Sequence, residues 1–486
     1  MNDMAGTRTG PDLSANWGRA HGFALFSLLL GAFLPPLDYF IVNLALPAIR
    51  TDLHASDAQL QLVVSAYACA YAVGLITGGR LGDRYGRKRL FLLGVGTFIC
   101  ASMLCGLAHS PDALIAGRVL QGLSASIMAP QVLASIRAVF RAEHQTRITA
   151  VYGFVFGVAA IVGQMGGGVL IDLNVLDLGW RAIFLVNVPV GAIVLLTAYF
   201  WVPESRASRH ARLDLVGVSL LTAVLVMVIY PLTQGAEQGW PAWTIITLML
   251  SVPLLWAFIR VESKVAARGG DPLIDLKVFA EPVIVLGLIA GFLFYTDGVF
   301  FLAFGIYLQA GLGWSAMDAG LLLIPFACGF IVGPLLTPIL VKHSGYWVVP
   351  IGYLLMCGGF GALAIQVGTG TLPGAEQYAA LLVAGIGHGI VLPSITRVIL
   401  VEATREQAGL VSGLIISTLQ IGSAFGVALL GGLFFSALGT DSGPVAYGQA
   451  LQVALFALIS LLLVCVGLGV WITVLIRRRT QRHDSQ

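Results

Sequence analysis

Three charged side chains lie deep inside apolar stretches of the sequence: Asp38, Arg118 and Asp297. The other charged residues sit at or beyond the ends of such stretches. A charge at the centre of a lipid bilayer costs roughly 2.5–3.5 kcal/mol on insertion scales, so such residues usually face a cavity or a partner and mark the path of a substrate or a proton. One fixed cation and two acids that can titrate therefore predict a polytopic carrier of protons or charged solutes.

Asp38 and Arg118 each allow a structural and a functional interpretation. Asp38 follows Pro35 and Pro36, which can break or kink a helix, so its carboxylate either caps a broken helix or takes part in coupling. Burial disfavours an ionised carboxylate and a neighbouring arginine favours it, so such a group can titrate as a pocket opens and closes. Arg118 cannot be deprotonated, so it either bonds backbone carbonyls of the first span or tunes an acid as a fixed cation. We favour the coupling role for both residues.

Asp297 lies in an aromatic stretch, where a helix would place it on one face with Phe294, Phe300, Phe301 and Phe304. An acid in an aromatic wall suits a hydrophobic cation, through ion pairing and cation–π contact. The alternative is that the rings face lipid or core and that Asp297 only bonds a neighbouring helix. We favour the cation-binding role.

His388 stands in the run Gly385–Gly389, in the middle of another apolar stretch. The ordinary pKa of histidine, about 6.5, suits proton transfer, although a lone histidine is more often a hydrogen-bonded packing residue. His388 is therefore a further candidate for coupling. Other polar residues within apolar stretches are candidates for the lining of a substrate cavity: Asn43, Tyr67, Tyr71, Gln121, Gln164 and Tyr295.

The composition indicates a membrane environment. Hydrophobic residues make up 58% of the chain and charged residues 10%, whereas a soluble protein carries about 25% charged residues. A membrane-spanning helix needs about 20 apolar residues, and the first apolar run is too long for a cleaved signal. The sequence therefore predicts an all-α polytopic membrane protein with 14 spans, near residues 21–47, 59–80, 90–108, 112–138, 146–172, 180–202, 214–234, 241–260, 282–309, 316–341, 346–368, 376–398, 406–437 and 447–476.

The predicted spans fall into two groups that repeat each other weakly. The fourth and twelfth spans share one Gly-to-Pro spacing, Gly122 to Pro130 and Gly385 to Pro393, and secondary transporters are often built from repeats with the substrate site between them. Lys and Arg residues gather on the side of both termini, which predicts that both are cytoplasmic. The predicted organisation begins with a cytoplasmic tail (1–20) and a six-helix bundle (21–202). A linker (203–281) follows, which contains two extra spans, near 214–234 and 241–260, and a surface amphipathic segment. The chain then forms a second six-helix bundle (282–476) and a basic cytoplasmic tail (477–486).

A glycine-rich basic loop joins the second and third predicted spans. It reads Gly-Arg-Leu-Gly-Asp-Arg-Tyr-Gly-Arg-Lys-Arg from Gly79 to Arg89. Glycines permit tight turns and close helix approach, and an acid among basic residues can accept charge-assisted hydrogen bonds. This loop resembles the hallmark loop of the major facilitator superfamily, which latches the cytoplasmic side of the transporter in the outward-facing state. The resemblance implies this gating role for Gly79, Asp83, Arg84, Gly86 and Arg87.

Further stretches narrow the resemblance to the fourteen-span drug:proton antiporters of that superfamily. These stretches are 37–47, 118–122, 180–191, 307–325 and 420–428. The resemblance implies two six-helix bundles with two extra central spans, and transport by alternating access. One departure lies in the fifth span, where the family reads Gly-Pro-x-x-Gly-Gly and this chain reads Gly163-Gln164-Met165-Gly166-Gly167-Gly168. A polar side chain thus replaces the proline that would kink the helix.

The residues and the resemblance together predict a proton-coupled exporter, a drug:proton antiporter, of hydrophobic and by preference cationic small molecules. The alternative is a carrier of the same fold for one metabolite, as importer or exporter. An enzyme is disfavoured because the sequence has no His-Glu-x-x-His, nucleophile elbow or Walker loop, and a channel because the resembled fold uses alternating access. We expect a monomer in the cytoplasmic (inner) membrane, driven by the proton gradient without a cofactor, and no nucleic-acid partner. The 6 cysteines are scattered, so neither disulfides nor a metal site are expected.

Overall fold

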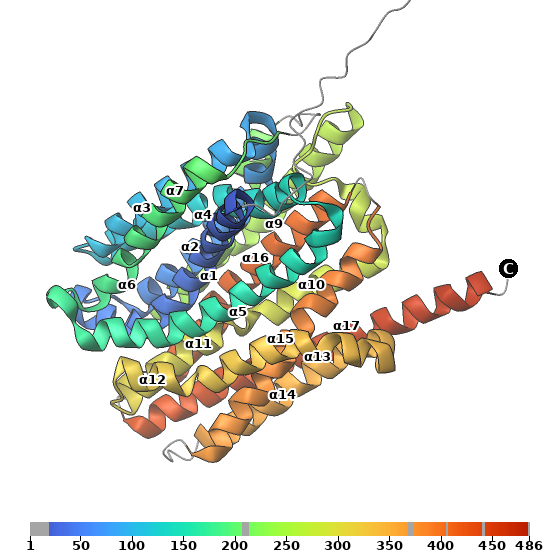
Figure 1. The fold of residues 1–486 in the computed structure, drawn as a ribbon. Coiled ribbons are helices and arrows are strands. Elements are labelled where there is room, and N and C mark those ends of the chain that lie inside the picture. Colours follow the sequence, from blue (N-terminus) through green and yellow to red (C-terminus); the bar gives the residue numbers. More distant parts are fainter. Residues whose placement is uncertain (1–18, 207–212, 368–373, 405–406, 440–442, 485–486) are drawn as a thin grey trace, which may run out of the picture.

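Helices make up every element of the computed structural model (Figure 1), which describes residues 19–206, 213–367, 374–404, 407–439 and 443–484. The all-α prediction is therefore confirmed for the described residues. We call α1 to α7 the first half and α10 to α17 the second half, and we call the end of the bundle that carries the Gly79–Arg89 loop the basic end.

The first half contains five long helices, α1 to α5, and a sixth membrane-length segment, Gly179–Trp201, that is interrupted near its start. Where α2 begins, the Ser56 side chain accepts a hydrogen bond from the Gln59 backbone N–H while the Gln59 side chain bonds the Ser56 backbone, which is a capping box. The helices are α1 (Arg19–Leu53), α2 (Asp57–Tyr85), α3 (Arg87–Gly106), α4 (Pro111–Val139), α5 (Ala142–Leu173), the short turns η1 (Val175–Asp177) and η2 (Gly179–Arg181), α6 (Ala182–Leu185) and α7 (Asn187–Trp201).

The rest of the chain adds a helical pair and the second half. The pair is α8 (Leu215–Gln238) and α9 (Ala242–Ala267), followed by the short turn η3 (Leu276–Ala280). In Figure 1, α17 extends beyond the other helices at its C-terminal end. The second half consists of α10 (Pro282–Phe294), η4 (Tyr295–Asp297), α11 (Gly298–Ile306), η5 (Tyr307–Gly311), α12 (Ala316–Leu322), α13 (Ile324–Ser344), η6 (Gly345–Trp347), α14 (Val348–Val367), α15 (Ala375–Val401), α16 (Ala408–Leu438) and α17 (Pro444–Asp484).

The described residues contain 13 helical segments that are long and apolar enough to cross a membrane, so the chain is a multi-pass membrane protein. This number does not confirm the predicted 14. One segment, Ala316–Val367, has 52 residues. At 1.5 Å per residue it would measure about 78 Å, more than twice the roughly 30 Å of hydrocarbon in a bilayer. It contains two of the predicted spans, and Gly345, with φ +58°, stands between α13 and α14.

The Gly-to-Pro repeat noted in the sequence marks two close helix crossings. A Cβ on Gly122 of α4 would lie 2.4 Å from the carbonyl oxygen of Tyr67 on α2. A Cβ on Gly385 of α15 would lie 2.1 Å from the carbonyl oxygen of Phe326 on α13. Backbone contact through small residues is typical of membrane helix packing, so each half uses the repeat in the same way.

The helix α8 packs against both halves at once. Its residues Ile229 and Leu232 form an apolar cluster with Ala68 of α2 and with Ala424 and Ala428 of α16. At the C-terminal end of α8, its last turn is tied to the first half, because the Ala58 backbone N–H donates to the Glu237 carboxylate over 2.7 Å. The extra helical pair therefore covers the line along which α2 and α16 meet.

The segment after α9 is held against the basic end of α2. The Arg80 guanidinium donates to the carbonyl oxygen of Asp271 over 3.1 Å and also bonds the carbonyl of Pro272. The Glu262 carboxylate accepts from the Ile274 backbone N–H over 2.8 Å. The amphipathic surface segment predicted within the linker corresponds to residues 273–279 and overlaps η3. Three of its apolar side chains, Leu273, Ile274 and Val278, are buried in the protein, whereas Phe279 is exposed.

Candidate transport site

Asp38 of α1 and Arg118 of α4 form a buried ion pair in the first half, with 0% of either side chain exposed. One Asp38 oxygen also accepts from the Gln121 amide over 3.0 Å and from the Asn187 amide over 2.9 Å. The helix α1 continues through Pro35 and Pro36 as one element from Arg19 to Leu53. The interpretation of Asp38 as the cap of a broken helix is therefore wrong, because side-chain donors of other helices bind its carboxylate.

Arg118 is held on several sides besides Asp38. Its Nε donates to the carbonyl oxygen of Val63 on α2 over 2.9 Å, and its Nη1 donates to the Gln121 side-chain oxygen over 2.9 Å. Its guanidinium carbon lies 4.3 Å from the centroid of the Tyr67 ring, a cation–π contact. The carbonyl that it bonds belongs to the second span rather than the first, and its charged partner is the acid. Removing one partner of such a pair leaves an uncompensated buried charge.

The structure adds residues to this first pair that the sequence prediction missed. Gln121, predicted to line a cavity, instead bridges Asp38 and Arg118, and it also donates to the Ser102 hydroxyl over 2.9 Å. Asn187 begins α7 and is 0% exposed. It lies in the stretch 180–191, so an amide in an otherwise apolar run was the available signal. Ser102 gave no such signal in the sequence, because serine is common in membrane helices.

Asp297 and His388 form a second buried pair, in the second half. The His388 Nδ1 lies 2.7 Å from an Asp297 carboxylate oxygen, with 8% and 4% of the two side chains exposed. Asp297 ends η4, a single turn of 3-10 helix between α10 and α11. Four rings surround the imidazole, with centroid distances of 4.7 Å (Phe294), 5.0 Å (Phe330), 5.8 Å (Phe326) and 6.1 Å (Tyr295). The histidine is thus neither alone nor exposed to lipid.

The predicted aromatic wall is present and packs mostly on itself. Phe300 stacks on Phe304 at 5.1 Å and contacts Phe360 of α14 at 5.0 Å. Phe301 differs, because its ring meets Phe40 of α1 at 5.3 Å and so reaches the first half. All the predicted ring residues of this wall are at most 4% exposed. The wall therefore forms a core within the second half that touches the first half through Phe301, and its faces are covered in this conformation.

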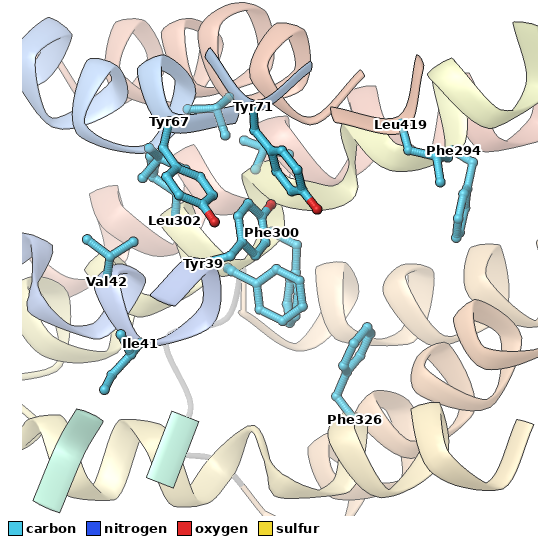
Figure 2. Close-up of a cluster of buried hydrophobic side chains, with 14 of the residues drawn as sticks. Tyr39, Ile41, Val42, Tyr67, Tyr71, Phe294, Phe300, Leu302, Phe326 and Leu419 are labelled. Carbon is cyan, nitrogen blue, oxygen red and sulfur yellow. The ribbon is translucent and has the colours of Figure 1, made fainter. Parts of the chain in front are cut away.

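Tyrosine side chains occupy the space between the two halves near the charged pairs (Figure 2). The Tyr39 hydroxyl lies 2.8 Å from the hydroxyl of Ser423 on α16, which joins the halves. The rings of Tyr67 and Tyr71 are 6.0 Å apart, and Figure 2 shows their hydroxyls pointing toward the region that the Tyr39 hydroxyl approaches from the opposite direction. The Asn43 amide donates to the Tyr39 carbonyl oxygen over 2.8 Å. Tyr39, which follows Asp38 in the chain, was not among the predicted site residues.

The halves are also in contact at the end of the bundle opposite the basic end. The Gln309 amide donates to the carbonyl oxygen of Leu44 over 2.9 Å, and the Met317 backbone N–H donates to the Asp172 carboxylate over 3.0 Å. Beyond the first of these bonds, a cavity of about 330 Å³ is lined by residues of both halves, among them Pro47, Arg50, Gln309 and Tyr447. The residues predicted to line a substrate cavity lie elsewhere, deeper between the halves.

Comparison with known proteins identifies the fold and the family. The family model described as Major Facilitator Superfamily matches residues 28–427. The chain belongs to this superfamily. Its fold agrees: a bacterial homologue of the human lysosomal transporter Spinster, in an inward-facing and occupied conformation, superimposes with a TM-score of 0.69 at 17% identity, over 94% of this chain and 98% of that one.

Curated members of the superfamily resemble this chain along most of its length. A probable actinorhodin transporter of Streptomyces coelicolor is 35% identical over 87% of this chain and 74% of its own. The tetracenomycin C resistance and export protein of Streptomyces glaucescens is 32% identical over 88% and 78%. The multidrug resistance protein Stp of Mycobacterium tuberculosis is 30% identical over 88% and 78%. The predicted resemblance to exporters of the major facilitator superfamily is therefore confirmed.

The hallmark loop of the superfamily is compact in this structure. Asp83 accepts two hydrogen bonds from Arg87, over 2.8 and 3.2 Å, and Arg87 also donates to the Ala134 carbonyl oxygen of α4 over 3.1 Å. Gly86 joins α2 to α3 with φ +113°, a conformation that favours glycine. Arg84 lies over the exposed Tyr85 ring. These contacts stay within the first half, so in this conformation the loop braces α2, α3 and α4.

Proposed function

We propose that this chain is a drug:proton antiporter, which exports hydrophobic small molecules by alternating access in exchange for protons. The observation that carries the proposal is one buried acid–base pair in each half, Asp38–Arg118 and Asp297–His388, with the tyrosine-lined contact between them. Buried ionisable groups of membrane helices commonly form proton relays. The functions of the relatives, which are transport of actinorhodin, resistance to and export of tetracenomycin C, and multidrug resistance, support export as the direction.

Asp38 is the proposed proton carrier. In the ionised state its oxygens accept hydrogen bonds from Arg118, Gln121 and Asn187. A proton on the carboxylate would cancel the charge that Arg118 faces and turn one acceptor into a donor. The protonated and ionised forms therefore favour different arrangements of α1, α4 and α7, and proton binding can shift the population between two conformations of the transporter.

Asp297 and His388 supply the proposed link between the proton and a cationic substrate. A cation that pairs with Asp297 must take the place of the imidazole now 2.7 Å from its carboxylate. A protonated imidazole and a substrate cation would thus compete for one carboxylate. Such competition is the condition for antiport rather than symport. The surrounding rings of Phe294, Phe326 and Phe330 suit a hydrophobic cation.

The proposed topology follows the sequence prediction. Segment Ala316–Val367 would cross the membrane twice, as α12 with α13 and then as α14, which gives 14 spans: two six-helix bundles and the extra pair. We propose that the basic end and both termini face the cytoplasm, because Lys and Arg prefer that side. The protein would act as a monomer in the inner membrane, without a cofactor. The second candidate, a carrier for one metabolite, is favoured only if a single compound is transported.

The test is dye transport in inverted membrane vesicles with and without an imposed pH gradient. We expect wild-type protein to accumulate a hydrophobic cationic dye only with the gradient, and Asp38→Asn at equal abundance to lose this accumulation. Asp112→Asn, which changes an exposed acid at the start of α4, is the matched control. Accumulation that does not depend on the gradient, or that survives in Asp38→Asn, contradicts proton coupling through Asp38.

A further inference from the structure

Gln164 of α5 is an exception among the buried amides of this protein. Its side chain is 2% exposed, and neither its Oε1 nor its Nε2 has a hydrogen-bond partner among the residues that the structure describes. Buried amides elsewhere in the first half do have partners: Gln121 bonds Asp38, and Gln131 donates to the Gly78 carbonyl over 2.8 Å. A buried polar group without a partner is costly, and within a bilayer the cost is greater. Such a group calls for a physical explanation.

The position of Gln164 shows when this amide could find a partner. On a helix, a residue shares its face with those three and four positions further on. Gly167 packs against α1, since its Cβ would lie 2.8 Å from Ile41 Cγ1, and Gly168 packs against α12, since its Cβ would lie 2.5 Å from the Met317 Cα. Gln164 therefore points between α1 of the first half and α12 of the second, at the interface that separates in alternating access.

The α5–α12 contact is tight in this conformation. A Cβ on Gly320 of α12 would lie 2.3 Å from the carbonyl oxygen of Gln164, so the two backbones touch beside the amide. The same contact is closed near its end by the hydrogen bond from Met317 to Asp172. A second amide lies at the neighbouring contact between α1 and α11, where a Cβ on Gly305 would lie 3.3 Å from the carbonyl oxygen of Asn43, and the Asn43 side-chain oxygen also has no partner among the described residues. Separation of α5 from α12 would expose the Gln164 amide to the transport path.

We propose that Gln164 is a hydrogen-bonding contact for the transported molecule, formed when this interface opens. A glutamine amide offers an acceptor oxygen and two N–H donors and carries no charge. It therefore selects molecules that present a donor and an acceptor side by side, such as carboxamides. This inference rests on the proposed export function and adds a neutral recognition element to the charged pairs. Two such hydrogen bonds correspond to a preference of about tenfold over an analogue that lacks the donor.

The test is equilibrium binding to purified protein in lipid nanodiscs. The probes are 2-naphthamide and N,N-dimethyl-2-naphthamide, which differ in the N–H donors of the amide. We expect the wild type to bind 2-naphthamide about tenfold more tightly than the dimethyl compound, and both Gln164→Met and Gln164→Leu to bind the two compounds equally. Gln131→Met, which removes a buried amide that has partners, should keep the preference.

Thermal unfolding of the same variants gives an independent readout. Gln164→Met should unfold at the wild-type temperature or above it, since it removes an amide without partners, whereas Gln131→Met should unfold at a lower temperature. Four results would each overturn the inference. The wild type could bind both probes equally, or bind neither. The preference could survive in both Gln164 variants, or Gln164→Met could lose as much stability as Gln131→Met. Gradient-driven dye export tests the antiporter proposal separately: intact export without an amide preference removes only the present inference, and an amide preference without export removes only the antiporter.

Discussion

The Asp38–Arg118 pair permits a quantitative prediction about stability. Arg118→Met should leave the Asp38 carboxylate buried with only the Gln121 and Asn187 amides as donors. Breaking a buried pair by removal of one partner typically costs about 3–5 kcal/mol, and both side chains here are 0% exposed. Asp38→Asn should cost a similar amount, because it leaves the guanidinium without its counter-charge. The double variant should lose about 2–3 kcal/mol less than the sum of the two single losses, which is the coupling energy of a contacting pair.

The assay is unfolding of the purified protein in mixed micelles by a denaturing detergent, followed by the fluorescence of its 9 tryptophans. Arg181→Met is the matched control. Arg181 also pairs with an acid, Asp52, over 2.7 Å, but the two side chains are 24% and 45% exposed, so its loss should cost about 1 kcal/mol or less. The reasoning is refuted if the single variants of the buried pair lose no more free energy of unfolding than this control. It is also refuted if the loss in the double variant equals the sum of the two single losses.

Five further predictions concern single residues. Asp297→Asn should reduce the export of cationic dyes more than that of neutral ones, which competition between dyes in vesicles measures. His388→Asn should weaken the dependence of cationic dye export on the imposed pH gradient, which transport at a series of gradients measures. Tyr39→Phe removes the 2.8 Å hydrogen bond between the halves, which is worth about 1 kcal/mol. The ratio of open to closed conformers should therefore shift roughly fivefold in cysteine-accessibility measurements. An unchanged ratio would argue against a role of Tyr39 in closure. Arg80→Gln frees the carbonyls after α9, so limited proteolysis should cut the segment 263–281 sooner than in the wild type while α2 stays intact. Asp83→Asn should leave membrane insertion normal and slow transport strongly, and wild-type rates at normal abundance would contradict the gating role.

The sequence predicted which charges are buried but not which groups they bind. Asp38, Arg118 and Asp297 stand out because an isolated charge in an apolar stretch is costly. The partner depends on how each helix is rotated and tilted, and hydropathy carries no such information. Arg118 was equally compatible with backbone carbonyls of the first span and with an acid, and only the packed bundle shows that it reaches Asp38.

The aromatic face of the ninth predicted span shows a second limit of sequence reasoning. The prediction placed Asp297 and the phenylalanines on one regular helix. The structure inserts the 3-10 turn Tyr295–Asp297 between α10 and α11. This turn changes the register, so that Asp297 meets His388 of α15, more than 90 positions away in sequence. Contacts at such a separation depend on tertiary packing, and the pair could not be read from local periodicity.

The distribution of charged and neutral contacts bears on how the halves can move. Each buried acid–base pair lies within one half, Asp38–Arg118 in the first and Asp297–His388 in the second. The contacts that join the halves through Tyr39 and Gln309 are neutral hydrogen bonds. Opening such a bond costs about 0.5–1.5 kcal/mol, whereas separating a buried ion pair would cost about 3–5 kcal/mol. The halves can therefore part without exposing an unpaired charge to lipid, and the charged pairs can change protonation within a half while neutral contacts open and close between them.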